Sequence, residues 1–249
     1  MPGPRPTARM PNSCCRSLPR RKVPSADPHS SSAMVALTAR YPICDLFASV
    51  QGEASWSGRP MLFIRFHGCP LACPWCDEPL HRDPAARREM LAEQLLQAVR
   101  RLHPRLPYLL LTGGEPLAVP RLAELVDFFK QQGFWQAMET SGVGGPIPEG
   151  VDWLTLSPKT KLAEAIYQRA NEVKYVIGPS PSPRLRAEIL QRAELHPNVW
   201  VQPRSGAEGN RQGQAIINPQ AVAACLQLID EAAGTIRLSL QLHKWLNLP

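Results

Sequence analysis

Three cysteines, Cys69, Cys73 and Cys76, are spaced C-x3-C-x2-C in one short stretch. A cysteine thiolate binds soft metals, so this spacing suits an iron–sulfur cluster or zinc. Electron-transfer clusters are usually held by four cysteines. Three cysteines therefore indicate a [4Fe–4S] cluster with one iron left open for an outside ligand. Pro70 and Pro74 oppose a continuous helix, so we predict a loop around the metal.

Zinc is the alternative metal, and it needs a fourth protein ligand. His67 is the nearest candidate in the sequence, but it lies only two residues before Cys69. That spacing is awkward for a chelate that must also include two further cysteines. The cysteine pattern, taken alone, therefore favours the cluster over zinc.

Two further motifs come directly after predicted strands and carry groups that suit a polar ligand. Residues 113–116 read Gly-Gly-Glu-Pro; glycines let a ligand approach the backbone closely, and the carboxylate of Glu115 can hold a cationic amine. Ser157 and Lys159 offer a hydroxyl and an ammonium, which suit ribose hydroxyls or a carboxylate. Each motif alone could also be a turn that ends a strand, so the combination carries the argument.

The motifs together resemble the radical S-adenosylmethionine (SAM) superfamily and, within it, the 7-carboxy-7-deazaguanine synthase family. The resemblance covers about residues 41 to 249 and implies that the open iron binds the amino and carboxylate groups of SAM. Besides the cysteine loop, it rests on residues 47–53, 63–66, 112–116, 139–142, 157–159, 202–203 and 241–244.

The resemblance implies which residues hold the cofactors. Cys69, Cys73 and Cys76 would ligate the cluster, and the end of the cysteine loop would contact the adenine end of SAM. Gly114 would meet the aminoacyl end, and weaker candidates for the ribose region are Glu139 and Ser141. The full set of expected SAM contacts is Trp75, Cys76, Asp77, Gly114, Glu115, Ser157, Pro158, Lys159 and Gln202.

The resemblance also implies the reaction. The reduced cluster would cleave SAM, and the resulting radical would take hydrogen from C6 of 6-carboxy-5,6,7,8-tetrahydropterin. Ring contraction with loss of ammonia would give 7-carboxy-7-deazaguanine, a precursor of queuosine, with flavodoxin or ferredoxin as the electron donor. Arg65 and His243 would be the catalytic residues. The expected substrate contacts are Val50, Gln51, Gly52, Arg65, Thr112, His243 and Pro249.

Arg65 and Glu78 each leave an alternative open. Arg65 lies on the predicted strand before the cysteine loop, where a guanidinium suits bidentate capture of a carboxylate, or else an ion pair with Glu53 or another acid. Glu78 stands where the family commonly has a threonine that helps to hold Mg²⁺. A carboxylate is a hard oxygen ligand, so we expect the Mg²⁺ site to be retained. The alternative is an ion pair with a base such as Arg82.

Rival functions share parts of this pattern. A glycyl-radical-enzyme activase also uses C-x3-C-x2-C, but its protein substrate gives no reason for Arg65 and His243. Another radical SAM enzyme acting on a related heterocycle is a second possibility. A non-catalytic cluster or zinc regulator would have no use for Gly114 and the other expected SAM contacts.

Composition limits the class of protein. Hydrophobic residues make up 44%, and no run of about 18 apolar residues predicts a membrane helix. The net charge of +7 is concentrated in residues 1–40, which hold seven of the 28 basic residues but one of the 21 acids. The nearly neutral remainder gives no reason to expect a nucleic-acid surface. Seven cysteines, three of them in one loop, fit a reducing cytoplasm. We also expect a homodimer.

The elements that must position these motifs alternate between strands and helices, which favours a parallel sheet. The resemblance implies an α/β fold, a partial TIM-like β/α barrel with about six parallel strands. Functional groups gather at the carboxyl ends of strands in such barrels. The expected strands are 61–66, 108–112, 135–139, 153–157, 173–177 and 199–202, preceded by an extended segment at 43–50. The expected helices are 84–102, one with Pro120 in its first turn, 183–196 and 219–233.

Residues 1–39 differ from the rest of the chain. They contain seven prolines, many serines and arginines, and no apolar periodicity, so we predict a disordered basic extension before a single domain at 40–249. Met34 is an alternative start of translation. A basic interaction tail or a targeting signal is less favoured, because the prolines spoil an amphipathic helix.

Overall fold

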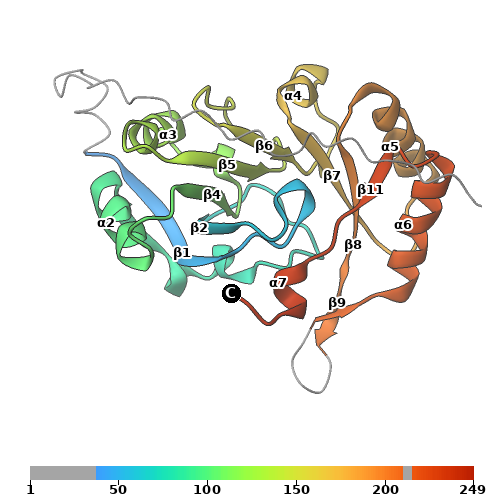
Figure 1. Cartoon of the computed structure of the whole chain (residues 1–249), viewed down its shortest axis with the longest axis horizontal. Helices are drawn as coiled ribbons and strands as arrows, with labels where there is room; N and C mark the ends of the chain where they lie inside the picture. The colour runs from blue at the N-terminus through green and yellow to red at the C-terminus, as the bar shows by residue number, and fades with distance from the viewer. Residues whose placement is uncertain (1–37, 210–214) are drawn as a thin grey trace, which may run out of the picture.

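A mostly parallel sheet forms the centre of the molecule (Figure 1) in this computed structural model, which describes residues 38–209 and 215–249. Nearly all of the predicted N-terminal extension lies outside the described residues. The sheet strands are β1 (Arg40–Val50), β2 (Pro60–Phe66), β3 (Arg88–Leu91), β4 (Tyr108–Gly113), β5 (Trp135–Thr140), β6 (Trp153–Leu156), β7 (Glu172–Ile177), β8 (Val199–Pro203) and β11 (Ile236–Leu238). A separate hairpin contains β9 (Ser205–Gly209) and β10 (Ala215–Ile217).

The strand order is β11-β8-β7-β6-β5-β4-β2-β1-β3. The neighbours from β2 to β11 pair in parallel, whereas β1 pairs antiparallel with both β2 and β3. Because β3 and β11 end the sheet without pairing to each other, the predicted incomplete β/α barrel is confirmed. The expectation of six parallel strands omitted β11, whose three residues are too few to show a pattern.

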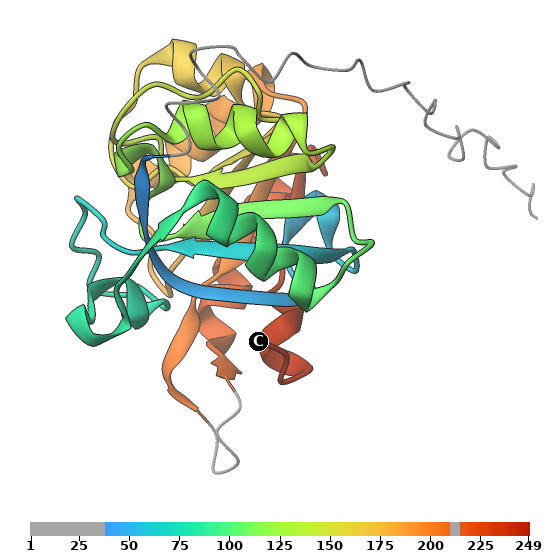
Figure 2. The ribbon, with the colours of Figure 1, turned by 90° about the vertical axis from the view of Figure 1, so that its left-hand side faces the viewer.

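Helices cover one face of the sheet, and Figure 2 shows α2 and α3, in green, in front of the strands. The helix predicted at 84–102 begins only at residue 92, because residues 88–91 pair as an edge strand with β1. Pro120 lies outside α3, since Arg121 caps that helix in a left-handed conformation. The helices are α2 (Ala92–Leu102), α3 (Leu122–Gln131), α4 (Glu164–Arg169), α5 (Pro183–Leu195), α6 (Pro219–Glu231) and α7 (Leu242–Trp245).

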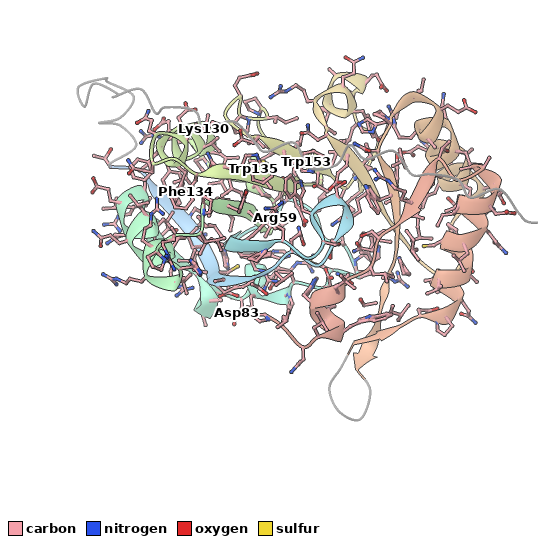
Figure 3. The ribbon with its side chains drawn as sticks, viewed as in Figure 1. Arg59, Asp83, Lys130, Phe134, Trp135 and Trp153 are labelled. Carbon is pink, nitrogen blue, oxygen red and sulfur yellow. The ribbon has the colours of Figure 1, made fainter. Side chains whose placement is uncertain are left out.

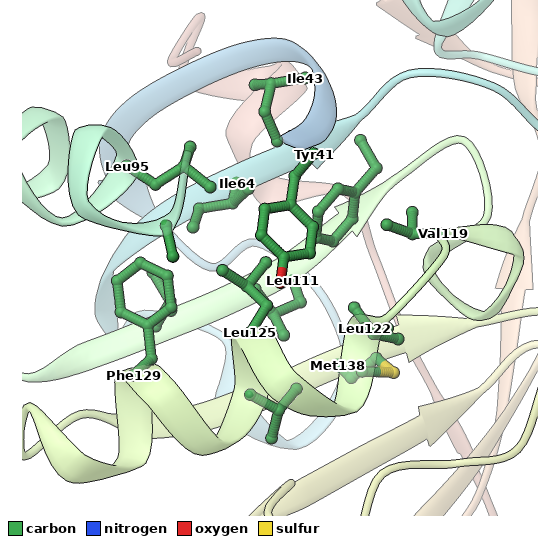
Figure 4. Close-up of a cluster of buried hydrophobic side chains, with 14 of the residues drawn as sticks. Tyr41, Ile43, Ile64, Leu95, Leu111, Val119, Leu122, Leu125, Phe129 and Met138 are labelled. Carbon is green, nitrogen blue, oxygen red and sulfur yellow. The ribbon is translucent and has the colours of Figure 1, made fainter. Parts of the chain in front are cut away.

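Alternation along the strands divides apolar from functional side chains. On β2, Ile64 packs into the core beneath the helices, while Arg65 lines a cavity on the other face. Figure 4 shows Leu95 of α2 and Phe129 of α3 in the same cluster of buried side chains, near Leu111 of β4. The helix-covered face therefore holds the main core and leaves the opposite face for a site.

Aromatic side chains fill the opposite face near the amino-terminal ends of the strands. The Trp56 ring lies 4.5 Å from that of Trp135 and 5.5 Å from that of Trp153. Arg59 lies over the rings of Trp56 and Tyr108, at 5.2 and 4.8 Å. Figure 3 labels Arg59, Trp135 and Trp153 in this part of the molecule. This packing occupies the amino-terminal half of that face, so the space for a ligand lies toward the carboxyl ends of the strands.

Candidate active site

A cavity of about 250 Å³ lies at the carboxyl ends of the parallel strands. The strand ends, the cysteine loop and the C-terminal segment all contribute side chains to it. Every site residue predicted above lines this cavity except Gly52 and Pro158. The structure thus brings together residues from Val50 to Pro249, which are nearly the length of the domain apart in sequence.

Gly52 supports the site from behind. A Cβ at this position would lie 2.7 Å from the backbone nitrogen of His243, and the Leu242 N–H donates to the Gly52 carbonyl at 3.0 Å. Only a glycine lets His243 approach this closely, so Gly52 has a packing role here, and its expected contact with substrate stays a prediction. Pro158, which lies between Ser157 and Lys159, does not line the cavity either.

The cysteine loop is joined at its base to the Gly-Gly-Glu-Pro motif. The Glu115 N–H donates to the Gly68 carbonyl at 3.0 Å, and the Gly114 N–H donates to that of Phe66 at 2.9 Å. A Cβ on Gly114 would lie 2.6 Å from the Gly68 carbonyl carbon. Gly114 is therefore needed for the packing of the two loops, whether or not a ligand approaches its backbone.

The three thiols fit a cluster better than a single ion. Cys69, Cys73 and Cys76 are free, partly exposed and open to the same cavity. Among the described residues, no group of three or more His, Cys, Asp or Glu converges closely enough to hold one metal ion. A [4Fe–4S] cluster presents its irons at separate corners, so three spread thiols beside open space suit it. His67, the zinc ligand considered above, instead places Nε2 3.0 Å from the Asp83 carbonyl.

Sequence reasoning missed His81, the histidine that does reach the cysteines. Its Nε2 lies 3.3 Å from Cys76 Sγ. The only sequence signal was a polar residue shortly after the third cysteine.

Glu115 braces the motif that contains it. Its carboxylate, 1% exposed, accepts hydrogen bonds from the N–H groups of Leu117 at 3.0 Å and Ser141 at 2.8 Å. The hydroxyls of Thr140 and Ser141 donate to it as well. Because these four donors belong to the protein, Glu115 ties the end of β4 to the end of β5.

Ser157, Lys159 and Trp75 meet on one wall of the cavity. Lys159 Nζ donates to Ser157 Oγ at 2.6 Å and lies 5.0 Å above the Trp75 ring. Burial, reinforced by the nearby Lys174 ammonium, lowers the pKa of Lys159 to about 8. The loop residue Trp75 and the motif after β6 thus form one surface, as expected for parts of a single ligand site.

Arg65 lies between acidic and aromatic side chains. Its Nη1 lies 2.7 Å from Glu78 Oε2 and 3.6 Å from Asp45 Oδ2, and its guanidinium lies 4.7 Å above the Phe47 ring. The acids that pair with Arg65 are therefore Glu78 and Asp45 rather than Glu53. Burial raises the pKa of Glu78, although Arg65 acts in the opposite direction.

Arg82, the other partner considered for Glu78, instead holds the cysteine loop. Its Nη2 donates to the carbonyls of Leu71 at 3.5 Å and Cys73 at 3.4 Å. The second Glu78 oxygen accepts a hydrogen bond from the Leu80 N–H at 3.1 Å. Glu78 thus links Arg65 to the turn that follows the cysteines.

A buried lysine on β7 was also missed from the sequence. Lys174, 4% exposed, pairs with Glu53 and lies 3.7 Å from Glu139 Oε1, which also accepts from Gln51 Nε2 at 2.8 Å. Burial would lower the pKa of Lys174, but Glu139 and Glu53 outweigh it and raise that pKa. The sequence signal for a buried ion pair was a charged residue within an apolar strand, and a second charged residue, Glu172, lies on the same strand.

The C-terminal segment is fastened to the cysteine loop. Lys244 Nζ lies 2.5 Å from Asp77 Oδ2, and Gln241 Nε2 donates to that oxygen and to Glu53 Oε1, both at 2.8 Å. Burial raises the pKa of Asp77, but Lys244 and Gln241 outweigh it and bring that pKa to about 2. These contacts hold α7 and the chain end (marked C in Figure 1) beside the cavity, where His243 and Pro249 line it.

Comparisons with known proteins agree with this geometry. The sequence profile of the radical SAM superfamily matches residues 63–194. A 7-carboxy-7-deazaguanine synthase of Escherichia coli strain K12 is 30% identical over 236 residues, which span 84% of this chain and 99% of the relative. One from Synechocystis is 42% identical over 147 residues, 57% of this chain and 67% of the relative. The crystal structure of QueE from Escherichia coli matches with a TM-score of 0.67 at 25% identity, covering 86% of this chain and 99% of that one.

Proposed function

The chain belongs to the 7-carboxy-7-deazaguanine synthase family of the radical SAM superfamily, and we propose on that basis how its cavity performs the family reaction. It is a radical SAM lyase of queuosine biosynthesis that converts 6-carboxy-5,6,7,8-tetrahydropterin to 7-carboxy-7-deazaguanine and ammonia. The observation that carries the proposal is one cavity that contains the three thiols, Lys159, Arg65 and His243. Neither an activase nor a non-catalytic regulator requires that combination.

The cofactor half of the cavity would hold the cluster on Cys69, Cys73 and Cys76. When bound, the [4Fe–4S] cluster and SAM supply the one-electron chemistry that removes a hydrogen atom from the substrate. Ser157 and Lys159 would give donors to the polar part of SAM. Trp75, which already lies beneath the Lys159 ammonium, would cover the ligand from the side of the cysteine loop.

The substrate half would hold the pterin carboxylate on Arg65. The Phe47 ring and Asp45 fix the guanidinium plane, and Glu78 occupies one of its donors until a substrate carboxylate replaces it. Burial lowers the pKa of His243, so this imidazole is neutral at pH 7 and can donate one hydrogen bond without adding charge. Val50, Gln51, Thr112 and Pro249 would contact the substrate.

The partners of the protein are also part of the proposal. The reaction requires an electron, and a flavodoxin- or ferredoxin-type protein in the cytoplasm would supply it. The nearly neutral body gives no reason for a nucleic-acid partner, and we propose a homodimer. In the part of the chain that the structure describes, no helix is long and apolar enough to cross a membrane.

The role of Glu78 depends on whether Mg²⁺ takes part in the reaction. We propose that the substrate carboxylate takes Arg65 and releases Glu78 to bind Mg²⁺ together with substrate oxygens, since Mg²⁺ needs few protein ligands and retains waters. Added Mg²⁺ should then raise wild-type turnover, and Glu78→Ala should blunt this response while uncoupled SAM cleavage continues. Turnover that is indifferent to both Mg²⁺ and EDTA would instead leave Glu78 as the ion-pair partner of Arg65.

The Asp77–Lys244 pair should position the substrate residues of the C-terminal segment. Lys244→Met removes a half-exposed ion pair worth about 1 kcal/mol, so the KM for the carboxypterin should rise about fivefold with kcat little changed. Limited proteolysis should cut the C-terminal segment faster in this variant, and Lys244→Arg should restore part of both properties. An unchanged KM together with unchanged proteolysis would show that the pair positions nothing.

The proposed activity can be tested in cells. The gene should restore queuosine to the tRNA of a bacterium that lacks its own 7-carboxy-7-deazaguanine synthase, as measured by mass spectrometry of digested tRNA. A gene carrying Cys76→Ala should produce the same amount of protein without restoring queuosine. Expressed wild-type protein that leaves the tRNA free of queuosine would argue for a different substrate.

A further inference from the structure

The side chain of His81 is buried and contacts the sulfur of a cysteine. It is 2% exposed, and its Nε2 lies 3.3 Å from Cys76 Sγ. Its other ring nitrogen, Nδ1, is buried without a hydrogen-bond partner. The polar atoms of a buried side chain normally all have hydrogen-bond partners. A buried imidazole with a cysteine sulfur as its side-chain partner, and with its other nitrogen unpaired, therefore needs a physical explanation.

The local chain holds this imidazole firmly. His81 lies in the short 3-10 turn η2 (Pro79–Arg82), which Pro79 begins and the Glu78 side chain caps by accepting from the Leu80 N–H at 3.1 Å. The His81 carbonyl accepts from the Gly68 N–H at 2.9 Å. The ring is therefore fixed relative to both ends of the cysteine loop.

Hydrogen-bond chemistry decides which nitrogen carries the proton. A neutral imidazole has one donor and one acceptor nitrogen, and a metal-bound thiolate only accepts. Nε2 must then carry the proton and point it at Cys76, which leaves Nδ1 as an acceptor. A buried acceptor without a partner is tolerated more readily than a buried N–H without one.

We propose that the His81 Nε2–H donates a hydrogen bond to the cluster-ligating sulfur of Cys76 and thereby raises the reduction potential of the cluster. Hydrogen bonds to ligand sulfurs are one of the factors that set cluster potentials. A donor at the sulfur stabilises the reduced cluster more than the oxidised one, because reduction adds negative charge to the sulfurs. The inference rests on the proposed function only in requiring a bound cluster.

His67 provides a matched control within the same loop. Its Nε2 lies 3.0 Å from the Asp83 carbonyl rather than near a sulfur. His67→Leu therefore removes an imidazole near the cluster without removing a hydrogen bond to a cluster ligand. His81→Gln keeps an N–H donor at the position, whereas His81→Leu has none.

The test is a reductive titration of anaerobically reconstituted protein without SAM, followed by electron paramagnetic resonance. At the wild-type midpoint potential, His81→Leu should show a tenfold smaller ratio of reduced to oxidised cluster, equivalent to about 59 mV for a one-electron couple. His81→Gln should recover part of the loss, and His67→Leu should match wild type. A wild-type midpoint in fully iron-loaded His81→Leu would overturn the proposal.

A second measurement needs no variant. Wild-type protein labelled with ¹⁵N-histidine should give a weak nitrogen coupling to the reduced cluster, as expected through a hydrogen bond. A strong coupling would show direct coordination of iron by His81, and no coupling would show that the ring has left Cys76; either result contradicts the proposal. Iron content and SAM cleavage, measured on the same samples, report on the proposed function independently of the potential.

Discussion

Replacing Cys69, Cys73 or Cys76 with alanine should abolish SAM cleavage. Wild-type protein reconstituted without oxygen should hold about four iron and four sulfide per chain, because the loop supplies three of the corners of one cluster. Each variant loses a ligand that the described part of the chain does not replace, so activity should fall below detection. Iron and sulfide analysis, together with assay of cleaved SAM, would measure both effects.

Cys225 provides the matched control. It lies on the buried face of α6, and burial raises the pKa of its thiol to about 12, so it does not offer a thiolate to a metal at neutral pH. Cys225→Ala should retain full iron and full SAM cleavage. Active wild-type protein that contained one zinc and no iron would refute the cluster assignment.

Lys174→Met should cause the largest loss of stability among the substitutions considered. Removing one partner of a buried ion pair typically costs about 3–5 kcal/mol, because the remaining charge stays buried without compensation. Here Glu53 and Glu139 would both lose the cation beside them. Lys130→Met, which breaks an exposed pair with Asp152, should cost less than about 1 kcal/mol. Chemical denaturation of each variant would measure the difference.

The pH dependence identifies the cause of that loss. Burial raises the pKa of Glu53, but Lys174 outweighs it and lowers that pKa, so the pair stabilises the wild type at neutral pH and does so less as pH falls through the folded pKa. In Lys174→Met the carboxylates of Glu53 and Glu139 should take up protons on acidification. Protonation removes their negative charges and with them the free-energy cost of burying those charges without a cation. The stability gap to wild type should therefore narrow between pH 7 and 4.5. A constant gap would attribute the loss to packing.

Residues with a local signature were predictable from the sequence. The cysteine spacing, the Gly-Gly-Glu-Pro motif and Arg65 each lie at the carboxyl end of a strand, and parallel strands bring such ends to one edge of the sheet. The alternation of strands and helices predicts the parallel sheet, and the family resemblance implies the partial barrel. Local motifs, together with the family resemblance, thus located most of the cavity wall without reference to the distant contacts that complete it.

Residues that act through distant partners were not predictable. Lys244 meets Asp77 only because the chain end folds back over the cysteine loop, and no sequence spacing encodes that contact. In the sequence, Lys174 is only a charged residue within an apolar strand. Its ion-pair partners Glu53 and Glu139 are distant in sequence and are identified only in the folded structure. Residues 88–91 read as the start of a helix because their pairing with β1, some fifty residues earlier, decides their conformation.

The most direct test of the central claim is an anaerobic turnover assay with mass spectrometry of the product. Reconstituted protein with SAM, a chemical reductant and 6-carboxy-5,6,7,8-tetrahydropterin should form 7-carboxy-7-deazaguanine and ammonia in equal amounts. A tetrahydropterin without the carboxyl group should give no product, because Arg65 would have no carboxylate to hold. SAM cleavage by fully loaded protein that leaves the carboxypterin unchanged would contradict the assignment.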